Sequence, residues 1–440
     1  MNPRRWPLNR AAIVVSLLVV SLIRCATAQY NGEHVIYRFQ GGVDGYSPMS
    51  SLISDPAGNF YGTTEYGGGS FYGTVFELSP PAQPGGEYNE TILHSFTNTG
   101  DGARPTAALL RDNAGNLYGT TSDSNAGGDG EVFKLSPPTQ PGGAWTESIL
   151  YHFQGGTDGA TPNAALITDG RGNLYGTATS SVFELSPPQN QGDAWTFTLL
   201  HEFKCCTSDG WNAVAPLVRD ASGNLYGTTE WGGYLNSDDC GSLGCGTVFE
   251  VSPPSQPGQA WTEKVIHTFT AGNDGFDPLT GLTLDTSGNL YGTTYSGGTG
   301  GGGTAFELTP PTAPDSSWTH AVIHNFTYSS TQDGAVPSSM ILDSSGHLFG
   351  STLFGGKQCA YNGAYYGCGT VFELRNQEGV WNERVLYFFH NGGVAARQPD
   401  AGVILDRAGN LFGTTEEGGY AQCYNGYSFC GTVYQIGMRK

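Results

Sequence analysis

DPAGNFYGTT, at residues 55–64, is a turn signal followed by a short β-like run, and versions of it recur along the chain. The marker glycine of the turn occurs in seven copies, spaced by 51 to 65 residues, at Gly58, Gly115, Gly172, Gly223, Gly288, Gly346 and Gly409. Self-similarity at such a period indicates a repeat architecture. We therefore expect one architecture of seven units across the 440 residues, in place of several unrelated domains.

Each unit contains four short β-like runs. In the first unit these are SSLIS (50–54), NFYGTT (59–64), GTVFELSP (73–80) and NETILHSF (89–96). The alternation of apolar and polar residues in the third and fourth runs is typical of strands. The first run begins with small residues, as a crowded strand near an axis requires, and Gly62 in the second run would permit close approach of a neighbouring sheet. Four-stranded units repeated in this way predict a β-propeller.

The two ends of the repeat region complement each other. EHVIYRFQGG (33–42) matches the fourth run of a unit, whereas the last unit stops after its third run, GTVYQI (431–436). An N-terminal strand that completes the last blade would close the ring. The sequence therefore predicts an all-β, seven-bladed β-propeller of four-stranded blades over residues 29–440, and an open solenoid would leave both ends incomplete.

Residues 1–28 differ from the rest of the chain. Three arginines precede the apolar run AAIVVSLLVVSLI, and ATA at 26–28 offers small residues for cleavage. This pattern predicts a signal peptide over 1–28 and a secreted, periplasmic or cell-surface protein. The run is shorter than the roughly 20 residues of a membrane span, so an uncleaved anchor, a twin-arginine signal and a lipoprotein at Cys25 are weaker alternatives.

The charge balance excludes one class of partner. Removing the leader, which holds four arginines and no acidic residue, takes the net charge from −20 to −24. Such acidity argues against nucleic acid as a partner and is explained by solubility. We expect a monomer without a membrane span in the mature chain.

The full repeat pattern is F-x-G-x-x-D-G-x-x-P-x-x-x-L-x-x-D-x-x-G-N-L-Y-G-T-T, followed by G-G and G-T-V-F-E-L-[ST]-P. It resembles the GloVer tandem repeat of secreted bacterial proteins over residues 33–437. The resemblance implies export and a repeat architecture, but no established reaction. The ending GTVYQIGMRK gives no support for a C-terminal anchor.

Eight cysteines remain after the leader, an even number that predicts disulfides in an exported chain. Six of them lie in pairs five to nine residues apart, each pair in one loop and each ending before G-T: Cys240 and Cys245, Cys359 and Cys368, Cys423 and Cys430. We expect three local disulfides. A zinc site is the alternative for these thiols, but they are scattered over three repeats. For Cys205 and Cys206, the sequence allows either a vicinal disulfide or two thiols.

Only the loop between the second and third runs varies widely in length. From the glycine of the second run to the third-run aromatic residue the steps are 14, 14, 7, 22, 14, 22 and 21, whereas the step from the repeat Asp to the marker glycine is always three. In a four-stranded blade this loop shares a face with the connection to the next blade, and we call that face the variable face. Binding residues tend to lie on loops held by a rigid scaffold.

The loops of the variable face carry aromatic and carboxylate side chains, which could stack on sugar rings and hydrogen-bond to hydroxyls. The ligand-binding residues predicted on this basis are Glu65, Tyr66, Trp231, Tyr234, Asp238, Phe354, Lys357, Tyr361, Tyr365, Glu416, Glu417, Tyr420 and Tyr424. The predicted function is the binding of an extracellular ligand, with a glycan as the best fit. Packing of the loops against one another would explain the same aromatic residues.

Two other function classes stay open. A polysaccharide lyase or glycosidase could use residues of the variable face that depart from the repeat pattern. The candidate acid and base carboxylates are Glu65, Glu230, Glu416 and Glu417, and the candidate side chains that stabilise charge are Lys357, His390 and Arg397. A protein-interaction scaffold is the third class. No nucleophile-elbow, zinc-protease, EF-hand, P-loop or dinucleotide motif occurs, so the sequence predicts neither a cofactor nor a metal.

Two columns of aspartates and one of histidines recur along the chain. The D-x-x-G column, such as Asp55, predicts turns closed by the carboxylate. The D-G column comprises Asp44, Asp101, Asp158, Asp209, Asp274 and Asp333, and six carboxylates near an axis could hold a cation. His94, His201, His267 and His324 share a fourth-run position with three tyrosines, which we interpret as amphipathic packing and not as a catalytic series.

Overall fold

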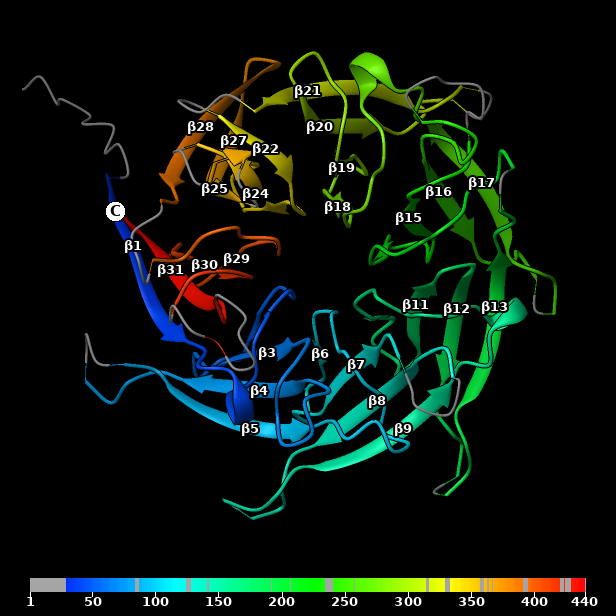
Figure 1. Cartoon of the computed structure of the whole chain (residues 1–440). Helices are drawn as coiled ribbons and strands as arrows, with labels where there is room; N and C mark the ends of the chain where they lie inside the picture. Colours follow the sequence, from blue (N-terminus) through cyan, green and yellow to red (C-terminus); the bar gives the residue numbers. More distant parts are fainter. Residues whose placement is uncertain are drawn as a thin grey trace, which may run out of the picture.

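The structure is a computed structural model. It describes residues 29–439 except 84–86, 124–127, 141, 191, 206, 234–239, 257, 314–315, 329–332, 357–359, 362–363, 366, 391–394, 420–422 and 424–428. Seven antiparallel sheets surround a central axis, as Figure 1 shows, so the chain is a seven-bladed β-propeller. The fold class predicted from the repeats is confirmed. The predicted signal peptide, 1–28, lies outside the described residues.

The strands follow the predicted runs closely, with a very short innermost strand in each blade. Blades 1 to 3 consist of β2 (Ile53–Ser54), β3 (Phe60–Thr64), β4 (Thr74–Ser79), β5 (Asn89–Ser95); β6 (Leu110–Arg111), β7 (Leu117–Thr121), β8 (Glu131–Ser136), β9 (Thr146–His152); and β10 (Ile167–Thr168), β11 (Leu174–Ala178), β12 (Ser181–Ser186), β13 (Thr196–Glu202). Blades 4 and 5 consist of β14 (Val218–Arg219), β15 (Leu225–Thr229), β16 (Thr247–Ser252), β17 (Thr262–Thr268); and β18 (Thr283–Leu284), β19 (Leu290–Thr294), β20 (Gly301–Thr309), β21 (Thr319–Thr327).

Blades 6 and 7 depart slightly from this pattern. Blade 6 consists of β22 (Gly334–Pro337), β23 (Ile341–Leu342), β24 (Leu348–Gly355), β27 (Thr370–Gln377) and β28 (Val380–Phe388), and its loop carries the small hairpin β25 (Ala360–Tyr361) and β26 (Ala364–Tyr365). Its long strand β24 pairs with both β22 and β23. Blade 7 consists of β29 (Ile404–Leu405), β30 (Leu411–Thr415), β31 (Thr432–Arg439) and β1 (Gln29–Arg38).

Blade 7 closes the ring with strands from both ends of the chain. β1 pairs antiparallel with β31, from Gln29 opposite Arg439 to Arg38 opposite Thr432, and the two lie side by side in Figure 1. The predicted closure is confirmed. This pairing joins residues about 400 positions apart in sequence within blade 7, and the chain runs on from β1 into blade 1, which closes the ring.

Aromatic residues join each blade to the next. The Phe that ends the fourth run, such as Phe96, is fully buried and meets the third-strand Phe133 of the following blade edge-on, with ring centroids 5.2 Å apart. The ring of Phe133 lies over Gly119 in its own blade, where an added Cβ would come within 2.5 Å of it. The second-strand glycine is therefore required by its own blade, and the expectation that Gly62 admits a neighbouring sheet is wrong, because Phe76 fills that space.

A girdle of hydrogen bonds surrounds the axis. The hydroxyl that follows the second-strand glycine donates to a backbone carbonyl at the inner edge of the next blade, as Thr63 does to Ala107 (3.3 Å) and Thr177 to Ala215 (3.0 Å). The last of these, from Thr414 to Ser50 at 3.0 Å, crosses the closure between blades 7 and 1. The threonine of the repeat motif thus links blades, in addition to its place in a strand.

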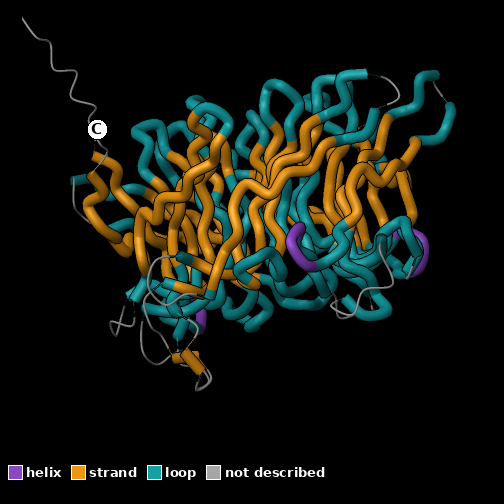
Figure 2. The backbone as a smooth tube through the Cα atoms, turned by 90° about the horizontal axis from the view of Figure 1, so that it is seen from above, coloured by secondary structure: helices purple, strands orange, loops and turns teal. Residues whose placement is uncertain are grey.

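The two faces of the ring carry different connections. The D-x-x-G turns lie on one face, and there the Asp55 carboxylate accepts from the backbone N–H groups of Ala57 (2.9 Å) and Asn59 (3.0 Å), as predicted. The variable face carries the loops of changing length and three 3₁₀ helices at Gly42–Asp44, Gly156–Asp158 and Gly272–Asp274, which Figure 2 shows on the same side of the disc but apart from one another around the ring.

Two of the three predicted disulfides are present on the variable face. Cys240 bonds to Cys245 and Cys423 to Cys430, with Cα atoms 5.1 and 5.2 Å apart. Cys368 is also disulfide-bonded, but its predicted partner, Cys359, lies outside the described residues. Cys206 lies outside them as well. In the part of the chain that the structure describes, no helix is long and apolar enough to cross a bilayer.

Candidate functional site

The two loops of each blade that reach the variable face pair with each other near the axis. Short antiparallel bridges join the loop that enters a blade to the second residue after that blade's second strand, as in Tyr46 with Tyr66, Trp211 with Trp231 and Arg397 with Glu417. These bridges confirm that the variable loop shares a face with the connection between blades. They also place both loops around the opening of the central channel, which we call the channel mouth.

Next to these bridges lies a ring of residues with left-handed backbones. At this position every blade has a residue with a positive φ, between 46° and 62°, and none of the seven is glycine: Ser47, Arg104, Thr161, Asn212, Asp277, Val336 and Gln398, which we call the mouth ring. Positive φ is costly for most L-residues and especially for β-branched ones such as Thr161 and Val336. Conformations of this kind are typical of functional sites whose surroundings enforce them.

Backbone hydrogen bonds hold the mouth ring in this conformation. On one side, the carbonyl of Asn212 accepts from the N–H of Glu230 at 3.1 Å, within the same blade. On the other side, mouth-ring N–H groups donate to the preceding blade, where three acceptors are disulfide-bonded cysteines. These bonds run from Ser47 to Cys430 (3.1 Å), Asp277 to Cys245 (3.1 Å) and Gln398 to Cys368 (2.9 Å). The disulfides therefore fix the carbonyls that anchor the mouth ring.

A cavity of about 480 Å³ occupies the channel at this mouth, and all seven blades contribute to its lining. Its wall consists largely of small residues, such as Ser50, Ala107 and Gly281, which is the role that the small residues of the first run predict. Tyr295 and Leu353 reach it from the mouth. Among the described residues that line it, Asp400 is the one carboxylate, and burial raises the pKa of Asp400.

A cluster of acidic residues lies where blades 7 and 1 meet at the mouth. Burial, followed by the charges of Asp400, Glu417 and Glu65, raises the pKa of Glu416 to about 7. Burial also raises the pKa of Glu65 and of Glu417. Arg397 offsets part of this charge, because its Nε lies 3.1 Å from Glu417 Oε2. A proton shared within this cluster at neutral pH can serve hydrogen bonding or acid–base chemistry.

Aromatic rings and guanidinium groups surround this acidic cluster. The rings of Tyr46 and Tyr66 stack with centroids 5.3 Å apart, and Arg104 lies over the ring of Tyr66 at 5.6 Å. On the other side of the cluster, Arg397 lies over the ring of Phe429 at 3.7 Å. Planar apolar surfaces thus stand beside charged hydrogen-bonding groups on one sector of the mouth.

A second, smaller polar sector lies across the ring, where blades 4 and 5 meet. The amide of Asn212 donates to the carboxylate of Glu230. Burial and the charge of Glu230 raise the pKa of Asp277 to about 6. Trp211 and Trp231 are joined by their backbones beside this pair. This sector repeats the combination of carboxylates and aromatic rings, but without the arginines of the first sector.

The family of the chain follows from its repeats. The model of the Gloeobacter/Verrucomicrobia repeat matches residues 22–184, 82–238 and 234–439, and these overlapping matches span the propeller. The chain belongs to the Gloeobacter/Verrucomicrobia repeat family. The resemblance seen in the repeat motif is thereby confirmed. No curated protein matches this family member.

Solved structures similar to this Gloeobacter/Verrucomicrobia repeat protein are distant. A luciferin-regenerating enzyme is 13% identical, with 75% of this chain and 91% of the other covered and a TM-score of 0.42. A gluconolactonase from Xanthomonas campestris is 13% identical (74% and 83% covered, TM-score 0.37), and the PQQ domain of a pyranose dehydrogenase from Coprinopsis cinerea is 12% identical (94% and 98% covered, TM-score 0.43). No ligand or reaction is transferred from them.

The structure of this Gloeobacter/Verrucomicrobia repeat protein brings some of the predicted site residues together. Glu65, Tyr66, Glu416 and Glu417 lie in the sector between blades 7 and 1, whereas Trp231 lies in the sector between blades 4 and 5 and Phe354 on blade 6. Tyr361 and Tyr365 belong to the hairpin β25–β26, and their side chains are not described. Outside the described residues lie Tyr234, Asp238, Lys357, Tyr420 and Tyr424.

Sequence reasoning missed several residues of the mouth. The mouth ring, including Arg104 and Asp277, and the cavity carboxylate Asp400 were not among the predicted residues. One signal could have found Asp400, because Met49, Thr106 and Asn163 stand in its place after the repeat proline. A charged residue in a neutral repeat column that lines the channel is a departure from the repeat, and departures of this kind mark candidate sites.

The D-G aspartates do not surround the axis, so that expectation is wrong. Their carboxylates turn back toward the outer strands, where Asp44 accepts from Gln40 N–H at 2.8 Å and from the Tyr37 hydroxyl at 3.2 Å. The column of His and Tyr residues, which we interpreted as amphipathic packing, has a second role. Its members do pack edge-on against the buried Phe, as His94 does against Phe96, but they also make polar contacts at the junctions between blades.

Proposed function

We propose that this protein binds an extracellular glycan at the channel mouth, with the sector between blades 7 and 1 as the principal contact. The mouth ring carries the proposal, because seven equivalent positions share a costly left-handed backbone but hold seven different side chains. A position whose side chain itself holds the backbone, such as the D-x-x-G aspartate, keeps the same residue in all seven copies. A binding surface needs one rigid frame that presents different side chains.

The chemistry of the sector suits a sugar. Carbohydrate rings have apolar faces and polar rims, and the partly exposed ring of Tyr66, which stacks on the buried Tyr46, offers partners for both beside the carboxylates of Glu65 and Glu417. The cavity of about 480 Å³ falls in the usual range for small-molecule sites, about 300 to 1,000 Å³. A terminal sugar would enter the channel toward Asp400, while the rest of the glycan would lie on the mouth.

The proposed place of action is outside the cytoplasm. Two disulfides on the described variable face are typical of an oxidising compartment. We propose that residues 1–28 are removed on export and that residues 29–440 form the mature protein, which meets glycans in the periplasm, on the cell surface or in the medium.

The test is a glycan array probed with purified residues 29–440, followed by calorimetry with the best ligand. We expect Tyr66→Ala to weaken binding at least tenfold, because it removes one stacking surface of the sector. Tyr88→Ala is the matched control, since Tyr88 is an aromatic residue on the opposite face, beside the Asp55 turn. Loss of binding in Trp231→Ala with no change in Tyr66→Ala would move the site to blades 4 and 5, and no retained glycan would overturn the proposal in favour of a protein-interaction scaffold.

A carbohydrate-active enzyme is a second candidate, and one observation favours it. Glu416, with a pKa raised to about 7, could donate a proton at neutral pH, as the general acid of a glycosidase or lyase does. Incubation of the bound glycan with the protein, followed by mass spectrometry, separates the two functions. Shortened or unsaturated products that disappear in Glu416→Gln would establish the enzyme, and an intact glycan would leave the binder.

A further inference from the structure

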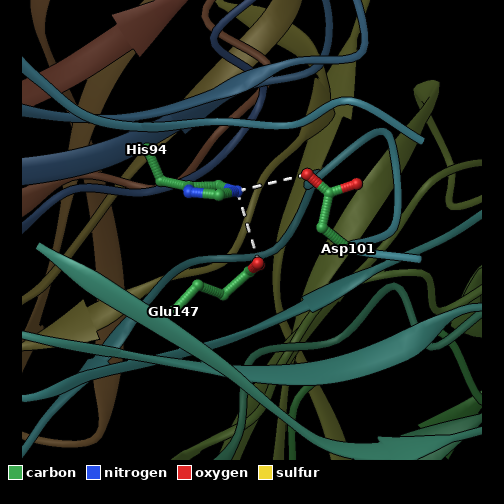
Figure 3. A group of neighbouring side chains, drawn as sticks. All are labelled: His94, Asp101 and Glu147. Carbon is green, nitrogen blue, oxygen red and sulfur yellow. Dashed lines mark ion pairs between the residues drawn. The ribbon is translucent and has the colours of Figure 1, made fainter. Parts of the chain in front are cut away.

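The outer ends of neighbouring blades meet in clusters of side chains that the proposed function does not use. At the junction of blades 1 and 2, His94 on β5, Asp101 in the loop that follows and Glu147 on β9 converge, as Figure 3 shows. His94 Nε2 lies 3.5 Å from Asp101 Oδ2 and 3.4 Å from Glu147 Oε1. One imidazole and two carboxylates are ligands that zinc and other divalent transition metals accept.

Two atoms of this cluster have no hydrogen-bond partner although they are buried. These are His94 Nε2 and Glu147 Oε1, which face each other. Buried polar atoms are nearly always satisfied, so a pair of this kind calls for an explanation such as an ion. Ligand atoms about 2.0–2.1 Å from a tetrahedral zinc stand about 3.3–3.4 Å apart, and the two measured separations agree with that spacing.

The same three residue types recur at two other junctions. His201, Asp209 and Glu263 converge between blades 3 and 4, and His324, Asp333 and Glu383 between blades 5 and 6, with their candidate ligand atoms within 4.8 Å of one another. In all three clusters the glutamate Oε1 is buried without a hydrogen bond. The clusters therefore occupy alternate junctions of the ring.

A junction with tyrosine in place of histidine serves as an internal comparison. Between blades 7 and 1, the hydroxyl of Tyr37 reaches both carboxylates, at 3.2 Å from Asp44 and 2.8 Å from Glu90. The longer tyrosine side chain thus fills the space between the two acids with an O–H donor. The shorter imidazole of His94 leaves that space open, and its Nε2 makes no hydrogen bond to Glu147 in the equivalent place.

We propose that the clusters centred on His94, His201 and His324 each bind a divalent transition-metal cation, with Zn²⁺ as the best fit to the ligand set and spacing. The cation would neutralise two partly buried carboxylates. At the first junction, the negative charges of Asp101 and Glu131 both repel the charge of Glu147. It would also link the outer strand of one blade to that of the next. Each side chain of the first cluster keeps 15 to 20% of its surface exposed, which leaves a route for the ion.

The test uses untagged residues 29–440, stripped with a chelator, dialysed against micromolar Zn²⁺ and measured by plasma mass spectrometry. We expect about three zinc ions per chain, one for each cluster. His94→Tyr should reduce this by one, and His94→Tyr/His201→Tyr/His324→Tyr should bind none at these sites. Tyrosine is chosen because the Tyr37 junction shows that the fold accepts it.

His152→Tyr is the matched control, since His152 lies on β9 but outside the three clusters. It should leave the zinc content unchanged. Zinc should also raise the thermal midpoint of the parent protein but not that of the triple variant, a readout that does not depend on any ligand of the mouth. Equal zinc content in the parent and the triple variant, with both folded by circular dichroism, would overturn the proposal.

Discussion

The two faces of the propeller use repetition in opposite ways. On the face of the D-x-x-G turns, the same side chain recurs seven times and accepts from the backbone N–H four residues on in every copy. Asp285, for example, accepts from the N–H groups of Ser287 and Asn289, both at 2.8 Å, and from the Asn289 amide at 2.9 Å. At the channel mouth, the backbone conformation recurs while the side chain changes at every copy. The turn face repeats its side chains, whereas the channel mouth repeats only its backbone conformation.

The difference shows which hydrogen bonds hold the backbone conformation on each face. In the turns, the aspartate side chain itself holds the backbone, so it cannot be exchanged without loss of the turn. In the mouth ring, backbone groups of the paired loop and of the preceding blade hold the backbone, as the bonds around Asp277 to Tyr295 (3.0 Å) and Cys245 (3.1 Å) show. The mouth-ring side chain does not hold its own backbone, so it can differ between blades. At Arg104 it is exposed to a ligand, whereas Ser47, Val336 and Gln398 are buried.

The largest effect that this comparison predicts is the loss of one turn aspartate. Asp285→Ala removes the bonds to Ser287 and Asn289, and hydrogen bonds to a charged group contribute about 1.5–3 kcal/mol each without simple additivity. We expect the free energy of unfolding to fall by about 3 kcal/mol, measured by urea denaturation. Asp285→Asn, which keeps one acceptor oxygen, should lose less than half of that.

Ligand binding at the mouth should be unchanged in Asp285→Ala under conditions where the variant is folded. The turn and the mouth lie on opposite faces, and no side chain is shared between them. An altered affinity with intact stability would contradict the division of labour between the two faces.

A smaller effect is expected from the acidic sector of the mouth. An ordinary glutamate releases its proton near pH 4.5, but burial and neighbouring acids raise the pKa of Glu416 to about 7. Between these values the folded state binds more protons than the unfolded state, so stability falls as pH rises from 4.5 to 7 and is level above. Partial exposure limits the effect to about 2 kcal/mol.

Glu416→Gln replaces the titrating carboxyl group with a neutral amide that carries no buried charge. The variant should therefore be more stable than the parent at pH 8 and similar to it at pH 4.5. Urea denaturation at the two pH values measures the difference. A gap between parent and variant that is the same at both pH values would show that Glu416 does not keep its proton. The expected result would show that the mouth holds its acids at a cost in stability, as binding sites do and turns do not.

The fold could be predicted from the sequence because each unit carries its own local signals. The turn residues around Gly58 and the alternation of the third run depend on residues close in sequence, and each end of the chain shows by itself which run of a unit it supplies. The face was predictable as well, since loop length varies on one connection only. Gly62 was misinterpreted because its neighbour is the ring of Phe76, and no spacing rule shows which side chain fills the space above a strand glycine.

The mouth ring and the junction clusters could not be predicted in this way. Left-handed backbone is normally signalled by glycine or asparagine, but Thr161 and Val336 are forced into it by partners from another loop and another blade. At the junctions, the contact between His94 and Glu147 joins positions 53 residues apart in different blades. Contacts between blades cannot be inferred from the sequence of one repeat unit.

The smallest predicted effect tests the strain in the mouth ring directly. Thr161 and Thr179 share a hydroxyl contact of 2.6 Å, but only Thr161 has a left-handed backbone, with φ of 46°. Asparagine tolerates that conformation, which costs most L-residues about 1–2 kcal/mol. Thr161→Asn and Thr161→Ala both remove this hydroxyl contact, so the difference between them reports the preference of each residue for the left-handed backbone. We expect Thr161→Asn to be the more stable of the two by about 1 kcal/mol in urea denaturation. Equal stabilities would mean that the ring is not strained, and the choice of side chain at the mouth would then carry no energetic argument for a ligand.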